Sequence, residues 1–182
     1  YDIGCNCFYN MMFRINECGE IDSSFGVNGL VKHTFDQSNQ AEAFALQPDG
    51  KILVAGLQSS SNAGSQQFPF VARYNYDGSV DSSFGTNGTN KIDYLNSGYF
   101  TYIYLMADGK ILCSGNPGRD NHYLVRFDST GTVDNTFGVN GVIQHPMPPG
   151  GVMLNGFESK MRSDGKIISV TSEFFNQSLL IS

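Results

Sequence analysis

The stretch "DSSFGVNG" (Asp22–Gly29) decides the fold, because the chain contains it three times. It returns as "DSSFGTNG" at Asp81–Gly88 and as "DNTFGVNG" at Asp134–Gly141. These three copies, called DxxFGxNG segments below, begin 59 residues (81 − 22) and 53 residues (134 − 81) apart. Self-similarity at such a period indicates a repeat architecture, in which each unit is one supersecondary structure.

Two further markers follow the same order. The first is "PDGKILVAG" from Pro48, which recurs as "ADGKILCSG" from Ala107 and as "SDGKIISVT" from Ser163. The second ends at the first residue of each DxxFGxNG segment and reads "FRINECGEID", "ARYNYDGSVD" and "VRFDSTGTVD". Three markers in one order are not explained by chance, so the chain is built from repeats.

Each unit predicts four short strands separated by turn signals. The predicted strands are 30–35, 89–94 and 142–145; 41–47, 100–106 and 156–162; 51–56, 110–115 and 166–171; and 70–75 and 123–128. Asp-Gly marks a hairpin turn between the second and third strands, and no long window has a helical apolar period. Four strands in about 55 residues are typical of a propeller blade. The predicted fold is therefore all-β, a β-propeller of four-stranded blades.

The units divide the chain as follows: residues 1–16 end a preceding blade, 17–75 form repeat 1, 76–128 repeat 2, and 129–182 a truncated or divergent repeat 3. We expect them to form one continuous propeller domain. Because "YNMMFRIN" aligns with "FPFVARYN", residues 9–16 are predicted to be a fourth strand whose blade-mates lie upstream or elsewhere. Propellers have about 4–8 blades, so about three repeats are expected to be part of a larger ring that extends beyond both ends.

Composition narrows the range of functions. The chain has 21 Gly, 14 Phe and 9 Tyr, and its charged residues amount to 15%, with a net charge of −6. Many glycines and aromatics with few charges suit short strands and tight turns. The absence of a Lys/Arg run argues against nucleic acid as a partner. No apolar stretch is long enough for a membrane-spanning helix, and no signal peptide is recognisable.

The sequence predicts no cofactor and no metal site. The cysteines Cys5, Cys7, Cys18 and Cys113 do not match common zinc spacings, so free or buried thiols are expected, with a disulfide among the first three left open. Calcium remains an alternative at 77–81, although the equivalent residues 129–134 offer fewer carboxylates.

The repeated residues are predicted to be structural, since a residue present in every unit serves every unit. The DxxFGxNG segment is interpreted as a connector between blades: its Asp caps backbone amides, its Phe fills the seam between units, and Asn-Gly adopts positive φ. An Arg eight residues before each Asp is expected to form a bidentate pair with that carboxylate. The set comprises Arg14, Asp22, Phe25, Gly29, Arg73, Asp81, Phe84, Gly88, Arg126, Asp134, Phe137 and Gly141.

Function is expected among positions that differ between units. The second unit is rich in aromatics, and Tyr99, Tyr102 and Tyr104 form a possible binding surface. If side chains alternate along this strand, Phe100, Tyr102 and Tyr104 share a face that either stacks on a partner or packs between blades. The histidines His33, His122 and His145 are scattered and are interpreted as structural. No catalytic residues are predicted, because no nucleophile motif or phosphate loop is present.

The chain resembles the delta-60 repeat family of bacterial propeller-type repeats. The resemblance rests on "RYNYDGSVDSSFG" followed by "TNG", on its two variants, and on "PDGKILVAG", and it covers Arg14 to about Thr171. It implies a β-propeller in a secreted or surface-exposed bacterial protein, without established catalytic residues. The chain departs from the pattern late, because "SDGKIISVTSEF" lacks the expected Ala-Gly and no Arg follows before Ser182.

The expected function is a non-enzymatic scaffold, extracellular or on the cell surface, that mediates protein–protein interaction or adhesion. Its expected partners are a protein or a surface glycan, together with further blades of the same protein. The alternatives are a glycan-binding module that uses the tyrosines of the second unit, and part of a propeller enzyme whose site lies outside this segment.

Overall fold

The structure is a computed structural model that describes residues 9–35, 38–59, 67–95, 98–116, 121–146, 151–153, 158–162, 164–170 and 173–175. Cys5, Cys7, the middle of the loop after Gln58, and Gly156 lie outside these residues. Every regular element in the described ranges is a strand. Among these residues no helix is present that is long and apolar enough to cross a membrane.

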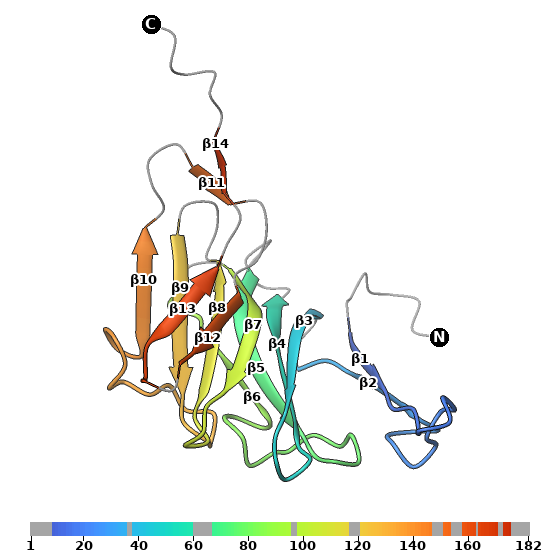
Figure 1. Cartoon of the computed structure of the whole chain (residues 1–182). Helices are drawn as coiled ribbons and strands as arrows, with labels where there is room; N and C mark the ends of the chain where they lie inside the picture. The colour runs from blue at the N-terminus through green and yellow to red at the C-terminus, as the bar shows by residue number, and fades with distance from the viewer. Residues whose placement is uncertain are drawn as a thin grey trace, which may run out of the picture.

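The strands follow the predicted pattern closely (Figure 1). They are β1 (Asn10–Phe13), β2 (Leu30–His33), β3 (Ser38–Leu46), β4 (Ile52–Ser59), β5 (Gln67–Tyr74), β6 (Thr89–Lys91), β7 (Tyr99–Leu105), β8 (Ile111–Asn116), β9 (Asn121–Phe127), β10 (Val142–Pro146), β11 (Gly151–Met153), β12 (Glu158–Met161), β13 (Ile167–Val170) and β14 (Glu173–Phe175). Each predicted strand range overlaps one of them, and only β11 and β14 were not predicted.

Two antiparallel sheets of four strands form the centre of the molecule. Their strand orders are β3-β4-β5-β6 and β7-β8-β9-β10. Strands that follow one another in the chain lie side by side in each sheet, which is the up-and-down arrangement of a propeller blade. The prediction of an all-β fold with four-stranded blades is confirmed.

The DxxFGxNG segment does not connect blades, and this part of the prediction was wrong. Residues 81–88 join β5 to β6, and these two strands pair within one sheet, with Ala72 opposite Thr89. The segment reverses the chain because Asn87 and Gly88 both adopt positive φ, so the strand that follows returns along its own blade. The chain crosses to the next blade between β6 and β7. The sequence repeats are therefore offset from the sheets by one strand.

Half-blades flank the two complete blades. On one side β1 pairs with β2, with Phe13 opposite Leu30, and this pair stands beside β3 in Figure 1. On the other side β12 pairs with β13 and β12 packs against β7. A further short pair, β11 with β14, extends the second hairpin.

The core lies in the seams between neighbouring blades. One cluster joins Leu53, Ala55 and Val71 of the first complete blade to Phe100, Ile111 and other residues of the second. Another cluster joins Phe25, from the segment between β1 and β2, and Val31 of β2 to the opposite face of the first complete blade. Both faces of that blade are covered, which explains why β4 and β5 are almost entirely buried.

A glycine near the end of the third predicted strand permits a close backbone contact. Gly56 lies opposite Ala41 and Gly115 opposite Phe100, and in both blades the partner strand bulges immediately afterwards. A Cβ at Gly115 would lie 2.0 Å from the backbone oxygen of Tyr99. Only glycine allows this approach, which re-aims the strand after the bulge.

Gly115→Ala is expected to destabilise the fold by about 2–3 kcal/mol, because the added methyl forces two backbones apart. Chemical unfolding followed by circular dichroism measures this loss. An unchanged unfolding midpoint would show that the close approach at the bulge is not needed.

Candidate functional site

The Asp81 carboxylate is the centre of a joint within the first complete blade. Its Oδ1 accepts hydrogen bonds from the backbone N–H and the hydroxyl of Ser83. Its Oδ2 accepts one from Arg73 Nε at 2.7 Å and one from Lys51 Nζ at 2.8 Å. The carboxylate therefore ties β5 and the residue preceding β4 to the DxxFGxNG segment.

The same joint reaches across the seam to the next blade. Arg73 Nη1 donates to the backbone oxygen of Ser129 at 2.7 Å, and Gly85 N–H donates to that of Thr130. The Arg73 guanidinium also lies 4.6 Å from the ring centroid of Phe84. Phe84 in turn is buried against Gly131, where an added Cβ would meet its ring. The segment thus holds blades together through non-covalent contacts, although it does not connect them covalently.

All three copies of the repeated set take part in equivalent contacts. Arg14 pairs with Asp22 and Arg126 with Asp134. Phe25 and Phe137 are buried under their own arginines. Gly29, Gly88 and Gly141 have positive φ, and a Cβ at any of them would collide with the Ile or Val eight residues earlier.

Sequence reasoning misjudged the arginine geometry and missed the lysines. Each arginine binds the carboxylate through Nε. The Nη2 group binds the Ser or Thr two residues after the Asp, so the pair is not bidentate. Lys51 and Lys110 form the second ion pair of Asp81 and of Asp134, respectively. Their presence in every "DGK" marker was the available signal, but separations of 30 and 24 residues gave no reason to pair them.

Phe100, Tyr102 and Tyr104 do not share one face, as alternation predicted that they would. The bulge between Phe100 and Tyr102 shifts the register, so Phe100 and Ile103 face the core together. Tyr99, Tyr102 and Tyr104 are each half-buried. Tyr104 packs with Met106, Leu112 and Leu124 in the seam toward β12 and β13.

The histidines are not all scattered as the sequence indicated, because His122 and His145 lie opposite each other on β9 and β10. Burial lowers the pKa of His122 to about 4, with a further contribution from His145, and burial also lowers the pKa of His33. Cys18 and Cys113 are free thiols, one exposed and one buried. No group of three His, Cys, Asp or Glu side chains suited to a metal ion occurs in the described part of the chain.

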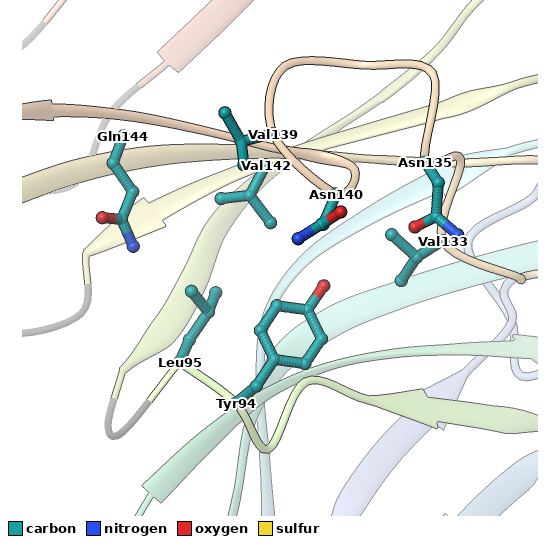
Figure 2. A pocket seen from close by; sticks show the side chains of 8 residues that line it. All are labelled: Tyr94, Leu95, Val133, Asn135, Val139, Asn140, Val142 and Gln144. Atoms are coloured by element: carbon teal, nitrogen blue, oxygen red, sulfur yellow. The ribbon is translucent and has the colours of Figure 1, made fainter.

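The groove with the most distinctive chemistry lies beside β10. It is a cavity of about 720 Å³, called the Tyr94 groove here, lined by Tyr94, Leu95, Val133, Asn135, Val139, Asn140, Val142 and Gln144. In Figure 2, Tyr94 and Leu95 point toward the turn and strand that carry Asn140 and Val142. None of the lining residues is charged.

A smaller groove occupies the equivalent place one blade earlier. It measures about 390 Å³ and includes Phe35, Asn87 and Lys91, which correspond in the repeat to Tyr94, Asn140 and Gln144. Phe35 is half-buried and packs against its core cluster, whereas Tyr94 is 52% exposed. The strands and turns around the groove therefore repeat from blade to blade, while the side chains that line it change. Sequence reasoning missed the groove because its lining residues are about 40 to 50 positions apart in the sequence.

One comparison with known protein families bears on this architecture. A family model described as a β-propeller domain of unknown function (DUF5122) matches residues 47–84 and 107–137. The chain carries β-propeller-type repeats. The two matched segments each run from the hairpin turn before the third predicted strand to the Phe of a DxxFGxNG segment. No curated protein matches the chain.

Arg73→Lys is expected to cost about 2 kcal/mol of unfolding free energy, because lysine cannot hold Asp81, Ser129 and the Phe84 ring at once. Arg14→Lys is the matched variant in the more exposed first joint, and there the loss should be smaller. Urea unfolding of both variants measures the difference. Equal stability of Arg73→Lys and the parent chain would exclude the joint as a stabilising element.

Stability is expected to fall in two steps as the pH is lowered. Between pH 6.5 and about 4 the unfolded chain protonates histidines that burial keeps neutral in the folded chain, chiefly His122. Below pH 3.8 the unfolded carboxylates protonate, while Asp81 stays ionised because bonds from Lys51, Ser83 and Arg73 outweigh the effect of burial and hold its pKa well below the ordinary value.

Melting temperatures from pH 8 to pH 3 test both steps. His122→Asn should flatten the first step and leave the second in place. A melting temperature that stays constant between pH 6.5 and 4 would contradict the assignment of the first step to buried histidine.

Proposed function

We propose that this chain is a non-enzymatic β-propeller scaffold that binds an extended protein segment in the Tyr94 groove. The observation that carries the proposal is that the Arg–Asp–Lys joints repeat between blades, whereas the uncharged side chains of the Tyr94 groove do not. The ionisable groups of the frame are engaged in the joints between strands and blades. The groove instead offers amides, one phenol and an apolar floor.

An extended polypeptide fits the position of the groove. β10 is the outermost strand of its sheet in the described residues, and Val142 and Gln144 of the groove lie on it. An incoming strand gains main-chain hydrogen bonds at such an edge and takes specificity from side-chain pockets. Asn135, Asn140 and Gln144 supply donors and acceptors for a peptide backbone, while Leu95 and Val142 provide apolar contact.

A neutral glycan is the second candidate, favoured by one specific feature. Tyr94 is exposed beside three amide side chains, and an aromatic ring with amides nearby can stack on a sugar and bind its hydroxyls. The half-buried Tyr99, Tyr102 and Tyr104 give this candidate less support than the sequence led us to expect. No observation favours an enzyme.

The cellular setting is part of the proposal. We propose that the repeats belong to the delta-60 repeat family and that the protein is bacterial and acts outside the cell or on its surface. The resemblance of "RYNYDGSVDSSFG" and "PDGKILVAG" to that family supports this, and so does the match to a β-propeller family.

A library of random peptides displayed on phage, selected on the parent chain, tests the proposed function. Recovered peptides should bind Val139→Asp at least about tenfold more weakly, because a carboxylate in the neutral groove loses solvation when a peptide covers it. Val27→Asp is the matched control. Val27 occupies the same repeat position, is also 77% exposed and lies outside the groove.

The outcomes separate the candidates. Peptides whose affinity falls in Val139→Asp but not in Val27→Asp support the proposal. Failure to recover peptides, together with binding of neutral oligosaccharides that Tyr94→Ala abolishes, would replace it with the glycan candidate. Peptides that bind both variants as tightly as the parent chain would overturn the assignment of the groove.

A further inference from the structure

The two half-blades are complementary halves of one blade. β1 and β2 flank a DxxFGxNG segment, as β5 and β6 do, and so represent the third and fourth strands of a blade. β12 and β13 flank a "DGK" turn, as β3 and β4 do, and so represent the first and second strands. In a complete blade the second strand pairs with the third, as β4 does with β5. Within the described part of the chain, the edges of β13 and β1 that this pairing would use carry no further strand.

The β1 side exposes apolar residues that complete blades bury. Phe13 is 64% exposed, whereas Ala72 and Val125 at the same repeat position are fully buried. Phe44 on β3 is 70% exposed, whereas Ile103 at its repeat position is buried. Between them lies an apolar cavity of about 440 Å³, lined by residues of β1 and β3. It occupies the place where the first two strands of the incomplete blade belong.

The β13 side has the matching exposure. Ile168 and Val170 are exposed, although Leu53 and Ala55 at their repeat positions are fully buried against the following blade. An added blade half would cover them with residues in the position of Phe44. Each half-blade therefore exposes the apolar surface that the other lacks.

The charges of the two halves are complementary as well. In both complete blades the lysine of the "DGK" turn binds the Asp of the DxxFGxNG segment at 2.8 Å. In the half-blades these groups are separated. Among the described residues, Asp22 pairs with Arg14 and with no lysine, and the ion-pair partner of Lys166 is its neighbour Asp164, at 3.7 Å. Joining the halves would bring Lys166 to Asp22 and restore the missing pair.

The seam contact at Gly19 is also incomplete. Gly78 and Gly131 are covered by Phe25 and Phe84 of the preceding blade, whereas an added Cβ at Gly19, their equivalent, meets nothing within 4 Å. Phe137 is the third Phe of the series, and no equivalent glycine follows it in the described residues. A ring that joins the two ends would place Phe137 against Gly19.

We propose that β12 and β13 of a second copy of this chain complete the half-blade formed by β1 and β2, and that two copies exchange these hairpins reciprocally. The described residues form two complete blades and two halves, which amount to three blades. A ring closed by these residues alone would have three blades, below the range of about 4–8 blades. Two copies give six blades with two-fold symmetry, and closed symmetry is the usual state of homo-oligomers.

The mass in solution is the first test. At tens of micromolar the 182-residue chain should have twice its chain mass of 19.9 kDa by light scattering. Val170→Glu, at an exposed position of the free β13 edge, should weaken the dimer at least about tenfold, because it buries a charge in the new seam. Val139→Glu is the matched control, since Val139 is an exposed valine (77%, against 66% for Val170) outside the hybrid blade, and this variant should leave the dimer intact.

Cross-linking tests the register. Val54 pairs with Ala72, and Cys113 pairs with Val125, so Ser169 of one copy should lie opposite Phe13 of the other. Mixing Phe13→Cys with Ser169→Cys and oxidising should yield a disulfide-linked pair of chains, identified by the mass of the linked peptide. Ile168→Cys is the control. It is one residue out of register and should link to Phe13→Cys far less.

A dimer with the Phe13–Ser169 link, weakened by Val170→Glu alone, supports the proposal. A monomer without the link overturns it. A link formed within one chain of the double variant at monomer mass would overturn the role of a second copy, and assemblies larger than two chains would overturn the closed ring.

Discussion

One carboxylate that accepts four hydrogen bonds in each complete blade, Asp81 in the first and Asp134 in the second, organises the rest of the structure. Burial of Asp81 costs solvation, and four donors from Ser83, Arg73 and Lys51 offset that cost. Because those donors come from different strands, the carboxylate can be satisfied only when the blade is fully formed. Arg73 then uses a further donor on the next blade. The arginine that neutralises Asp81 therefore also fixes the position of the next blade.

The fold could be predicted from the sequence to the level of the strands. Turn residues such as Asn87-Gly88 have few allowed conformations, so their meaning does not depend on distant contacts. Blade membership could not be predicted, since the strand after the DxxFGxNG segment could pair backward or forward without changing any local pattern. The pairing of Ala72 with Thr89 decides the question, and that is a tertiary fact.

The candidate site could not be predicted from the sequence for the same reason, since it depends on tertiary contacts. A single bulge beside Gly115 moves Phe100 and Tyr102 to opposite faces, and simple alternation cannot anticipate it. The Tyr94 groove joins residues from two blades, so no continuous motif marks it. The rule that function lies where units differ still leads to the right comparison, because Tyr94 and Phe35 share a repeat position but not an environment.

The two flanks of the array have the chemistry of interfaces rather than of caps. Repeat arrays that end in solvent carry polar terminal units, and exposed edge strands are normally protected by charge, proline or a bulge. β1 reads "NMMF" and β13 reads "IISV", with none of these features. In the part of the chain that the structure describes, Asp22 also lacks the lysine that both complete blades supply. An incomplete ion-pair cluster beside an unprotected apolar edge is expected of a blade whose other two strands come from another segment.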